Sequence, residues 1–394
     1  MKKNCLIIGG GFAGLNAAIS LEKELNSEYQ IILMDKNDYH LRRVLLFKEA
    51  ADGKELKIPF RELLPETVKF IQGDLYDVQK CNRKVDYHDQ NSKLRSIEYD
   101  KLILALGSVC KTISSEFGGI ALTDIDAAHK IKKTWQANFR EAKKTVDLKR
   151  RKALLSVAVV GAGITGIETA TELTHSMREY AQKLELDLNL VSTYLINSKA
   201  DIFEQGTSRT RHKIRQEIEK CGITILDGRR GGHFRNNSLR LDKNGEEEKL
   251  SVGTVVWTLG VSINPIINNL DIPLTTKGKI VVDKSYHVEK DIYSIGDCAH
   301  IVDFKTGKID GMTCKEAVPQ AHRLAKVLKA EIKHKKLPEH KSYTSLFCIS
   351  MGPNNGIFWM KIGRRELLLR KRLGWLMRAY TWNLVSLQKG IRIT

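Results

Sequence analysis

Two stretches of the chain show the same order of apolar, small and polar positions. In the first, the apolar residues 5–8 lead into a glycine-rich turn at 9–14, and Ala and Leu then recur at helical spacing over 15–25. A second apolar run, 31–34, ends on Asp35. Strand, tight turn, helix and strand in this order predict a βαβ unit, which implies a parallel sheet.

The same order returns about 150 residues later. Residues 157–160 are apolar, a second glycine-rich turn covers 161–166, a helical pattern continues to about Tyr180, and 188–196 reads as an apolar strand. Two copies of one such unit predict an α/β protein with two Rossmann-like dinucleotide-binding domains.

The remaining pattern is less regular. A charged stretch, 130–152, predicts a surface helix and a connection into the second unit, and short strands at 101–106, 254–259 and 279–282 are expected to complete the sheets. After about Lys336 the chain becomes a Pro-, Lys- and His-rich link and then a basic, Trp-containing tail.

Each of the three fingerprint glycines in the first turn is expected to serve a different purpose. Gly9, Gly11 and Gly14 fit the pattern GxGxxG, in which the first glycine allows the turn, the second lets backbone approach a pyrophosphate and the third lets helix pack on strand. Free N–H groups at the helix start then hold the phosphates. Asp35 follows where a carboxylate can accept from ribose hydroxyls. The alternative is an ordinary glycine-rich turn.

The second turn repeats the fingerprint with Gly161, Gly163 and Gly166. Two fingerprints in one chain imply two dinucleotides, most simply a flavin and a nicotinamide. No acid follows the second strand, where Asn197 stands before Ser198 and Lys199. Asn197 can hydrogen-bond a ribose hydroxyl, whereas Ser198 with Lys199 can receive a 2′-phosphate. NADH and NADPH both stay open, with a lean to NADH.

Composition narrows the class of protein. Of 394 residues, 65 are Lys or Arg and 46 are Asp or Glu, which gives 65 − 46 = +19. The seven cysteines form no CxxC and no zinc-like spacing, so we expect reduced thiols and no metal. No run of 18 apolar residues occurs, and the N-terminus enters a strand pattern directly, so neither a spanning helix nor a signal peptide is expected. No nucleic-acid-binding module is present, and nucleic acid is not an expected partner.

Six segments, in order and spacing, resemble the type II NADH dehydrogenases: 9–14 with Asp35, then 38–46, 58–64, 99–108, 256–261 and 292–299. These are FAD-containing, single-subunit, non-proton-pumping enzymes that oxidise NADH and reduce quinone at the membrane surface. The resemblance implies a discontinuous FAD-binding domain (1–115 and 272–336), an NAD(P)H-binding domain (116–271) and a C-terminal segment (337–394) that docks on membrane or partner.

The resemblance also assigns residues. Asp297 matches the carboxylate that hydrogen-bonds the ribityl chain of FAD, and Glu168 matches a carboxylate beside nicotinamide and flavin, although a Glu in the first turn of a helix also suits the helix dipole. Together with the fingerprints it places cofactor contacts at Gly9, Gly11, Phe12, Ala13, Gly14, Asp35, Lys36, Ala105, Gly107, Gly161, Gly163, Thr165, Gly166, Asn197, Gly260, Gly296, Asp297, Ala317 and Val318.

The acceptor end departs from the family pattern. Members carry AQxAxQ at the start of a helix under the flavin; here the stretch 315–320 keeps Gln320 but has Lys315 and Glu316 in place of Ala and Gln. We therefore take Glu168, Glu316 and Gln320 as the candidate catalytic residues. Capping of the helix start is the alternative for Glu316 and Lys315.

The tail concentrates the positive charge. Residues 361–394 hold nine basic residues and one acid, so this segment carries +8 of the +19. Helical spacing from Leu369 to Leu387, with Trp375 and Trp382 nearby and Arg378 among the basic residues, predicts a basic amphipathic helix suited to an anionic membrane surface. A helix packed on the protein's own core, or one that docks an acidic protein, would show the same pattern.

These observations favour an FAD-dependent NAD(P)H dehydrogenase that passes hydride from NADH to FAD and electrons to a membrane quinone. It would be cytoplasmic and peripheral on the inner face of the cell membrane, and a homodimer is consistent with the sequence. Two alternatives stay open: a soluble reductase of a small redox protein, and a flavin-binding sensor with little turnover. Without a CxxC, a dithiol intermediate is not expected, and Cys110, Cys298, Cys314 and Cys348 read as buried thiols.

Overall fold

The computed structural model describes residues 2–53, 55–343 and 345–385. Within them, eight strands form the first sheet, in the order β20-β21-β8-β1-β2-β5-β6-β7. Its centre, from β21 to β5, is parallel, and antiparallel strands extend it at both edges. The strands are β1 (Lys3–Ile8), β2 (Tyr29–Asp35), β5 (Lys69–Gln79), β6 (Lys84–Asp89), β7 (Leu94–Glu98), β8 (Lys101–Leu104), β20 (His287–Glu289) and β21 (Ile292–Ser294).

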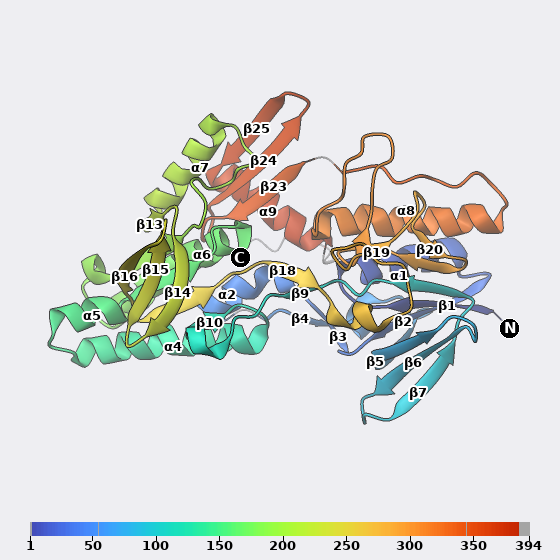
Figure 1. The fold of residues 1–394 in the computed structure, drawn as a ribbon, viewed down its shortest axis with the longest axis horizontal. Helices are drawn as coiled ribbons and strands as arrows, with labels where there is room; N and C mark the ends of the chain where they lie inside the picture. The colour runs from blue at the N-terminus through green and yellow to red at the C-terminus, as the bar shows by residue number, and fades with distance from the viewer. Residues whose placement is uncertain (1, 54, 344, 386–394) are drawn as a thin grey trace.

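The first βαβ unit is confirmed as β1, α1 (Phe12–Leu25) and β2. Helix α8 (Cys314–Ile332) lies along α1 on the same face of the sheet (Figure 1), and Leu21 and Leu324 belong to one apolar core. Strands β8 and β21 are parallel neighbours although the second unit separates them in sequence. This first half of the molecule is therefore built from two separate stretches of chain.

The second sheet is wholly parallel, in the order β10-β17-β11-β12-β13. The apolar run 188–196 is only partly strand, because 188–190 form a short 3₁₀ turn. The helices of this half are α4 (Ile125–Lys144), α5 (Leu148–Leu154), α6 (Ile164–Lys183) and α7 (Ser208–Lys220). The strands are β10 (Ile120–Ala121), β11 (Ser156–Val160), β12 (Ser192–Ile196), β13 (Ile223–Leu226), β17 (Thr254–Trp257) and an antiparallel set, β14 (Arg230–Arg235), β15 (Ser238–Lys243) and β16 (Glu246–Ser251).

Two structures join the halves. The two crossover segments pair as an antiparallel ribbon of β9 (Ser108–Cys110) and β18 (Val261–Ile263), which lies between the halves in Figure 1. Helix α2 (Leu46–Ala51) leaves the first half and packs between α4 and α6 of the second, so that Phe47 shares a core with Trp135. The remaining short elements are β3 (Tyr39–Leu41), β4 (Lys57–Pro59), α3 (Phe60–Leu63), β19 (Ile280–Val281) and β22 (Ala299–His300).

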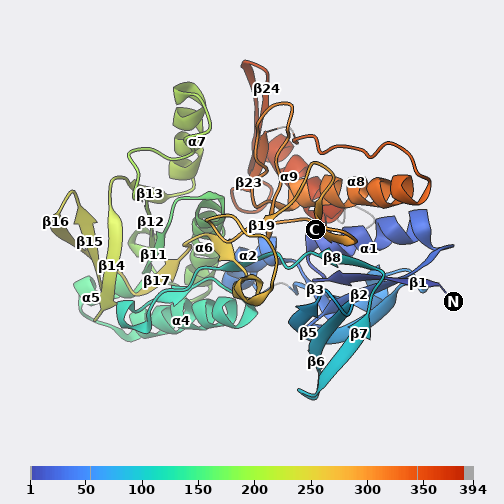
Figure 2. The ribbon, with the colours of Figure 1, turned by 45° about the vertical axis from the view of Figure 1, so that its right-hand side comes forward.

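The C-terminal part is a three-stranded antiparallel sheet followed by a helix: β23 (Leu346–Ser350), β24 (Gly356–Ile362), β25 (Arg365–Arg370) and α9 (Lys371–Val385). Leu369, expected in the helix, lies in β25. Trp375, Ala379 and Trp382 are buried, so one face of α9 packs on the body of the protein. Figure 2 shows α9 between this sheet and α8. Residues 386–394 of the expected amphipathic segment lie outside the described residues.

Candidate functional site

The two glycine-rich turns have the same internal geometry. A Cβ on Gly14 would stand 1.8 Å from the carbonyl oxygen of Gly9, and a Cβ on Gly166 would stand 1.7 Å from that of Gly161. Both are far below any real contact, so only glycine lets α1 and α6 approach the preceding strand end this closely. The third glycine of each fingerprint is thus required by packing alone.

The middle glycines are different, because nothing lies within 4 Å of a Cβ placed on Gly11 or on Gly163. Each caps the N-terminus of its helix, α1 or α6, without a side-chain hydrogen bond at that end. Open space in front of free backbone N–H groups at a helix start is what a pyrophosphate requires. The residues present therefore fit a dinucleotide at both turns, with Phe12 and Ala13 in the first turn of α1 and Thr165 in that of α6.

Asp35 is the last residue of β2, as expected, and it also helps to hold the first glycine-rich turn in shape. Its Oδ2 accepts from the N–H of Gly10 at 2.6 Å and its Oδ1 from that of Asn37 at 2.8 Å. Burial raises the pKa of Asp35, and these N–H groups oppose that shift. His40, which sequence reasoning missed, is buried and hydrogen-bonds the carbonyl of Gly10 through Nδ1. Lys36, the next predicted contact, is exposed.

Asp297 follows β21 at the end of the first sheet. Its Oδ2 accepts from the hydroxyl of Ser108 at 2.6 Å and lies 3.8 Å from Nη2 of Arg43. Arg43 also donates to the Ser108 hydroxyl, at 2.8 Å. Ser108 and Arg43 fix this carboxylate, and neither belongs to the predicted set. Among the other predicted contacts, the carbonyl of Ala105 packs against Gly9, whereas Gly107 and Gly260 face open space.

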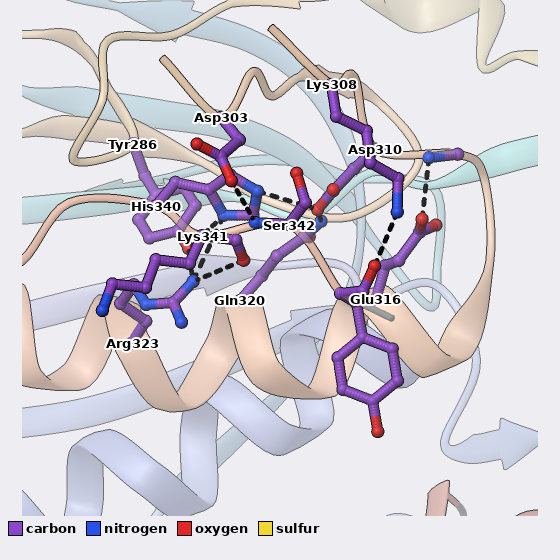
Figure 3. Close-up of polar contacts among 12 residues, drawn as sticks. Tyr286, Asp303, Lys308, Asp310, Glu316, Gln320, Arg323, His340, Lys341 and Ser342 are labelled. Atoms are coloured by element: carbon purple, nitrogen blue, oxygen red, sulfur yellow. Dashed lines mark hydrogen bonds and ion pairs between the residues drawn. The ribbon is translucent and has the colours of Figure 1, made fainter. Parts of the chain in front are cut away.

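Two of the three catalytic candidates, Glu316 and Gln320, lie near the start of α8 and make different contacts (Figure 3). Glu316 accepts from the N–H of Gly311 at 3.0 Å and from the hydroxyl of Thr313 at 2.6 Å, so both of its oxygens secure the helix entry. These contacts favour the capping interpretation. Gln320 is buried and bridges the first sheet and a loop, because its Oε1 accepts from the N–H of Gly296 at 2.8 Å and its Nε2 donates to Asp310 at 2.9 Å.

Lys315, Ala317 and Val318 occupy the first turns of α8. Lys315 does not face solvent: its ammonium donates to the carbonyl of Leu346 and lies 3.9 Å from the centre of the Phe347 ring. Burial lowers the pKa of Lys315. This side chain fastens α8 to β23, so the lysine that departs from the family pattern serves to hold the C-terminal sheet in place.

Glu168 is brought next to the C-terminal part of the chain. Arg378 on α9 donates to both of its oxygens, at 2.8 and 2.9 Å, and the N–H of Ser350 donates to Oε1 at 2.8 Å. Burial raises the pKa of Glu168, and Arg378 opposes that shift. The side chain of Arg378 is only 11% exposed, so the expectation that Arg378 is a surface cation is wrong.

The end of β12 shows how the missing acid is replaced. Asn197 is buried; its Nδ2 donates to Asp227 at 2.8 Å and its Oδ1 accepts from the N–H of Lys199 at 3.2 Å. Asp227 follows the neighbouring strand β13 and also pairs with Arg215 of α7. A carboxylate from the next strand therefore lies beside Asn197, at the end of β12. Only the pairing of β12 with β13 reveals this, so the sequence carried no signal for it.

The cysteines form no disulfide within the described part of the chain. Burial raises the pKa of the Cys110, Cys298, Cys314 and Cys348 thiols, which disfavours the reactive thiolate. Among all the residues that the structure describes, no group of His, Cys, Asp and Glu side chains is arranged to hold a metal ion.

Comparison with known proteins finds relatives over most of the chain. The family model described as "Pyridine nucleotide-disulphide oxidoreductase" matches residues 3–323. A type II NADH:quinone oxidoreductase of Staphylococcus haemolyticus is 24% identical over 369 residues, which cover 90% of this chain and 89% of the relative. The protein of the same name from Staphylococcus aureus is 23% identical with the same coverage.

Among solved structures, NDH2 from Plasmodium falciparum in complex with NADH superposes with a TM-score of 0.82 at 18% identity, covering 99% of this chain and 95% of that one. The sulfide:quinone oxidoreductase from Aquifex aeolicus gives 0.76 at 15% identity, with 97% and 90% covered. At these identities the structural likeness concerns the fold.

Proposed function

The chain belongs to the pyridine nucleotide-disulphide oxidoreductase family and is an oxidoreductase, and we propose that it is an FAD-dependent NADH dehydrogenase that passes its electrons to a quinone. The observation that carries the proposal is the pair of open-faced glycine turns, Gly9–Gly14 in the first half and Gly161–Gly166 in the second. The curated relatives named type II NADH:quinone oxidoreductase support the choice of donor and acceptor.

FAD belongs at the first turn and NADH at the second. Bound there, the two groups supply hydride transfer from nicotinamide to flavin, which needs orientation and exclusion of water more than acid–base catalysis. The N–H groups at the starts of α1 and α6 would hold the pyrophosphates, and Asp297, kept in place by Ser108 and Arg43, would accept hydrogen bonds from the ribityl hydroxyls.

The nicotinamide preference follows from the end of β12. Lys199 pairs with Glu204, and Arg215 pairs with Asp227 and Asp201. Each of these two cations therefore already has an acidic partner, and a 2′-phosphate would meet the carboxylate of Asp227. A neutral ribose hydroxyl suits this arrangement better, which favours NADH over NADPH.

A quinone acceptor requires contact with lipid, and α9 offers a surface for it. No helix of the described residues is long and apolar enough to span a membrane. On the side of α9 opposite its buried tryptophans, Leu373 is 62% and Tyr380 48% exposed, and Arg372, next to Leu373, is exposed as well. We call these three residues the outer face of α9. Exposed apolar and basic residues on one helix suit peripheral binding to an anionic surface, here the cytoplasmic face, where NADH is supplied.

The test follows the electrons in two steps. The purified chain reconstituted with FAD should show the visible absorption of bound flavin, and NADH added without oxygen should bleach it in a stopped-flow spectrometer. Menaquinone should then restore the colour faster than a small iron–sulfur protein does. Colour restored only by the iron–sulfur protein would favour the reductase alternative, and a chain that binds no FAD would contradict both.

A further inference from the structure

The link between α8 and the C-terminal sheet is fastened to the FAD-binding half. We call residues 338–342 the strap. The hydroxyl of Ser285 donates to the carbonyl of Pro338 at 3.1 Å, and the N–H of His340 donates to the carbonyl of Lys284 at 2.7 Å. The N–H of Ser342 donates to Asp303 at 2.9 Å. These bonds carry the imidazole of His340 into the interior, where the residue is 5% exposed.

The neighbours of His340 fix its tautomer (Figure 3). Nδ1 lies 2.9 Å from the hydroxyl of Tyr286 and 3.4 Å from Nη1 of Arg323. A guanidinium can only donate, so Nδ1 is the accepting nitrogen and Nε2 carries the hydrogen. Nε2 lies 3.2 Å from Oδ2 of Asp310, an electrostatic contact that lacks the geometry of a hydrogen bond. Burial raises the pKa of Tyr286 to about 12, so its hydroxyl keeps the proton that it donates.

Asp310 passes this orientation on to Gln320. The same Oδ2 accepts from Nε2 of Gln320 at 2.9 Å. A carboxylate offers only acceptors, so the amide nitrogen of Gln320 must face Asp310 and its oxygen must face the other way. That oxygen accepts from the N–H of Gly296. Reversing the amide would oppose two acceptors at one end and two donors at the other.

Gly296 connects this chain of contacts to the flavin site. Its φ is +80°, and a Cβ there would lie 2.9 Å from Cβ of Ala13, so the turn packs directly on the first fingerprint. The next residue is Asp297. A continuous line of polar contacts therefore runs from the strap to the turn that we assign to the ribityl chain.

We propose that His340 and Asp310 are positioning residues for the flavin: they hold the amide of Gln320 in the orientation that anchors the Gly296–Asp297 turn, and so set the affinity for FAD. The proposal rests on the FAD site proposed above. Burial of these groups supports it, because Asp310 is 6% exposed, and neither its Oδ1 nor Nε2 of His340 has a hydrogen-bond partner among the described residues. Apolar side chains of similar size would stabilise such an interior better, so stability alone does not explain a carboxylate here.

The experiment compares single variants of the full chain. Fluorescence quenching gives the dissociation constant of FAD from the apoprotein, and redox titration gives the flavin midpoint potential. His340→Leu and Asp310→Leu each leave buried polar partners unsatisfied, so we expect FAD to bind about tenfold or more weakly. His340→Gln, which keeps a donor towards Asp310, should recover most of the affinity. Asp310→Asn keeps an accepting oxygen and should bind FAD nearly as wild type does, with a more positive midpoint potential because a negative charge is lost.

His322→Leu is the matched control, because His322 lies exposed on α8, two residues from Gln320. His322→Leu should change neither the dissociation constant of FAD nor the flavin midpoint potential. Wild-type FAD affinity in His340→Leu would overturn the proposal, and so would equal losses in the Leu and Gln variants at position 340. If His340→Leu does not fold, Asp310→Leu decides, and wild-type FAD affinity in that variant counts against the proposal, as does an unchanged midpoint potential in Asp310→Asn. Failure of the wild-type chain to bind FAD would instead contradict the proposed function.

Discussion

Arg378 binds both carboxylate oxygens of Glu168 from 210 residues further along the chain. Both side chains are nearly inaccessible, at 11% and 3% exposure, so water contributes little to stabilising either charge. Fork-to-carboxylate geometry gives the pair two parallel hydrogen bonds, and the N–H of Ser350 adds a third to the same carboxylate. Helix α9 is thereby tied to the first turns of α6, the helix that follows the second glycine-rich turn.

Removing the arginine should destabilise the protein strongly. Arg378→Ala leaves Glu168 buried without its cation, which costs about 3–5 kcal/mol of unfolding free energy in such pairs. Without Arg378 the pKa of the buried Glu168 lies still further above its ordinary 4.5, so this loss is largest at neutral pH and shrinks as pH falls towards 5. Urea unfolding at pH 7.5 and pH 5 measures both effects.

Arg372→Ala on the same helix is the control, since Arg372 is exposed, and its effect should stay within about 0.5 kcal/mol. The double variant Glu168→Leu/Arg378→Leu should regain much of the stability, because an apolar pair needs no charge partner. Equal losses in the single and double variants would show that packing of α9, and not charge, explains the effect.

Substituting alanine for two glycines of the first fingerprint should affect different properties, FAD affinity in one case and stability of the apoprotein in the other. Gly11→Ala places a methyl group in open space, so the apoprotein should keep its melting temperature while FAD affinity falls. Gly14→Ala drives a methyl group against the carbonyl of Gly9, so the apoprotein itself should lose stability, by about 1–3 kcal/mol. Calorimetry of the apoproteins with FAD titration separates the two. Unchanged FAD affinity in Gly11→Ala would contradict the assignment of the pyrophosphate to this turn.

Asp227 should control the choice of nicotinamide. Asp227→Ala removes one acidic partner of Arg215 and the carboxylate held by Asn197, so the ratio of kcat/KM for NADH over NADPH should fall by about tenfold or more. Steady-state assays with both nucleotides measure the ratio. Glu246→Ala, on the exposed strand β16 of the same half, should leave it unchanged. An unaltered ratio in Asp227→Ala would place nicotinamide selection elsewhere.

The outer face of α9 should govern binding to vesicles. Arg372→Ser/Leu373→Ser removes one cation, worth about 1 kcal/mol at an anionic surface, and one exposed leucine, worth about 1.5 kcal/mol when buried in lipid. Co-sedimentation with phosphatidylglycerol vesicles should weaken by about tenfold or more. Leu148→Ser/Lys149→Ser likewise removes one leucine and one basic residue, at two exposed positions of α5, and should have no effect. Equal behaviour of the two double variants would argue against a membrane role for α9.

His287 should give the fold a pH-dependent component. Its Nε2 lies 2.7 Å from Glu331, which raises the pKa of His287 above 6.5, and Glu331 has its own pKa lowered to about 2. The histidine contribution is therefore complete below pH 6.5 and is lost as pH rises through the raised pKa. The glutamate contribution is complete above pH 4.5 and is lost on acidification. His287→Gln should destabilise at pH 5.5 more than at pH 9, measured by urea unfolding, with a glutamine at the exposed His212 of α7 as the control.

Local pattern was enough for the dinucleotide turns, because each fingerprint contains its own strand, turn and helix. It left Glu316 open between a catalytic role and capping of the helix start, and only the contacts with Gly311 and Thr313 favour the second. The stripe of Trp375 and Trp382 was ambiguous for a physical reason. A helix buries one face in the same way whether it packs on lipid or on protein, and only the positions of its neighbours distinguish the two.

Other contacts could not be read from the sequence, because each joins residues that only the tertiary fold brings together. Arg378 of α9 reaches Glu168 of α6, Asp227 meets Asn197 because β12 and β13 pair, and His340 of the strap meets Asp310. In the sequence, Arg378, Asp227 and His340 stand in segments whose pattern is typical of a surface or a turn. Burial changes their chemistry, and burial at these positions is set by long-range packing.

The position of α2 has a consequence for how the molecule unfolds and works. Lys48 pairs with Glu172 of α6 at 3.2 Å and lies 5.4 Å from the ring centre of Trp382, so one short helix ties both nucleotide-binding halves to α9. Separating the halves would expose Phe47 and Trp135 and break a buried ion pair. The molecule should therefore melt as a single cooperative unit, and proteases should not release either half intact. Nucleotides would then exchange in a rigid frame, without the hinge opening common in two-domain enzymes.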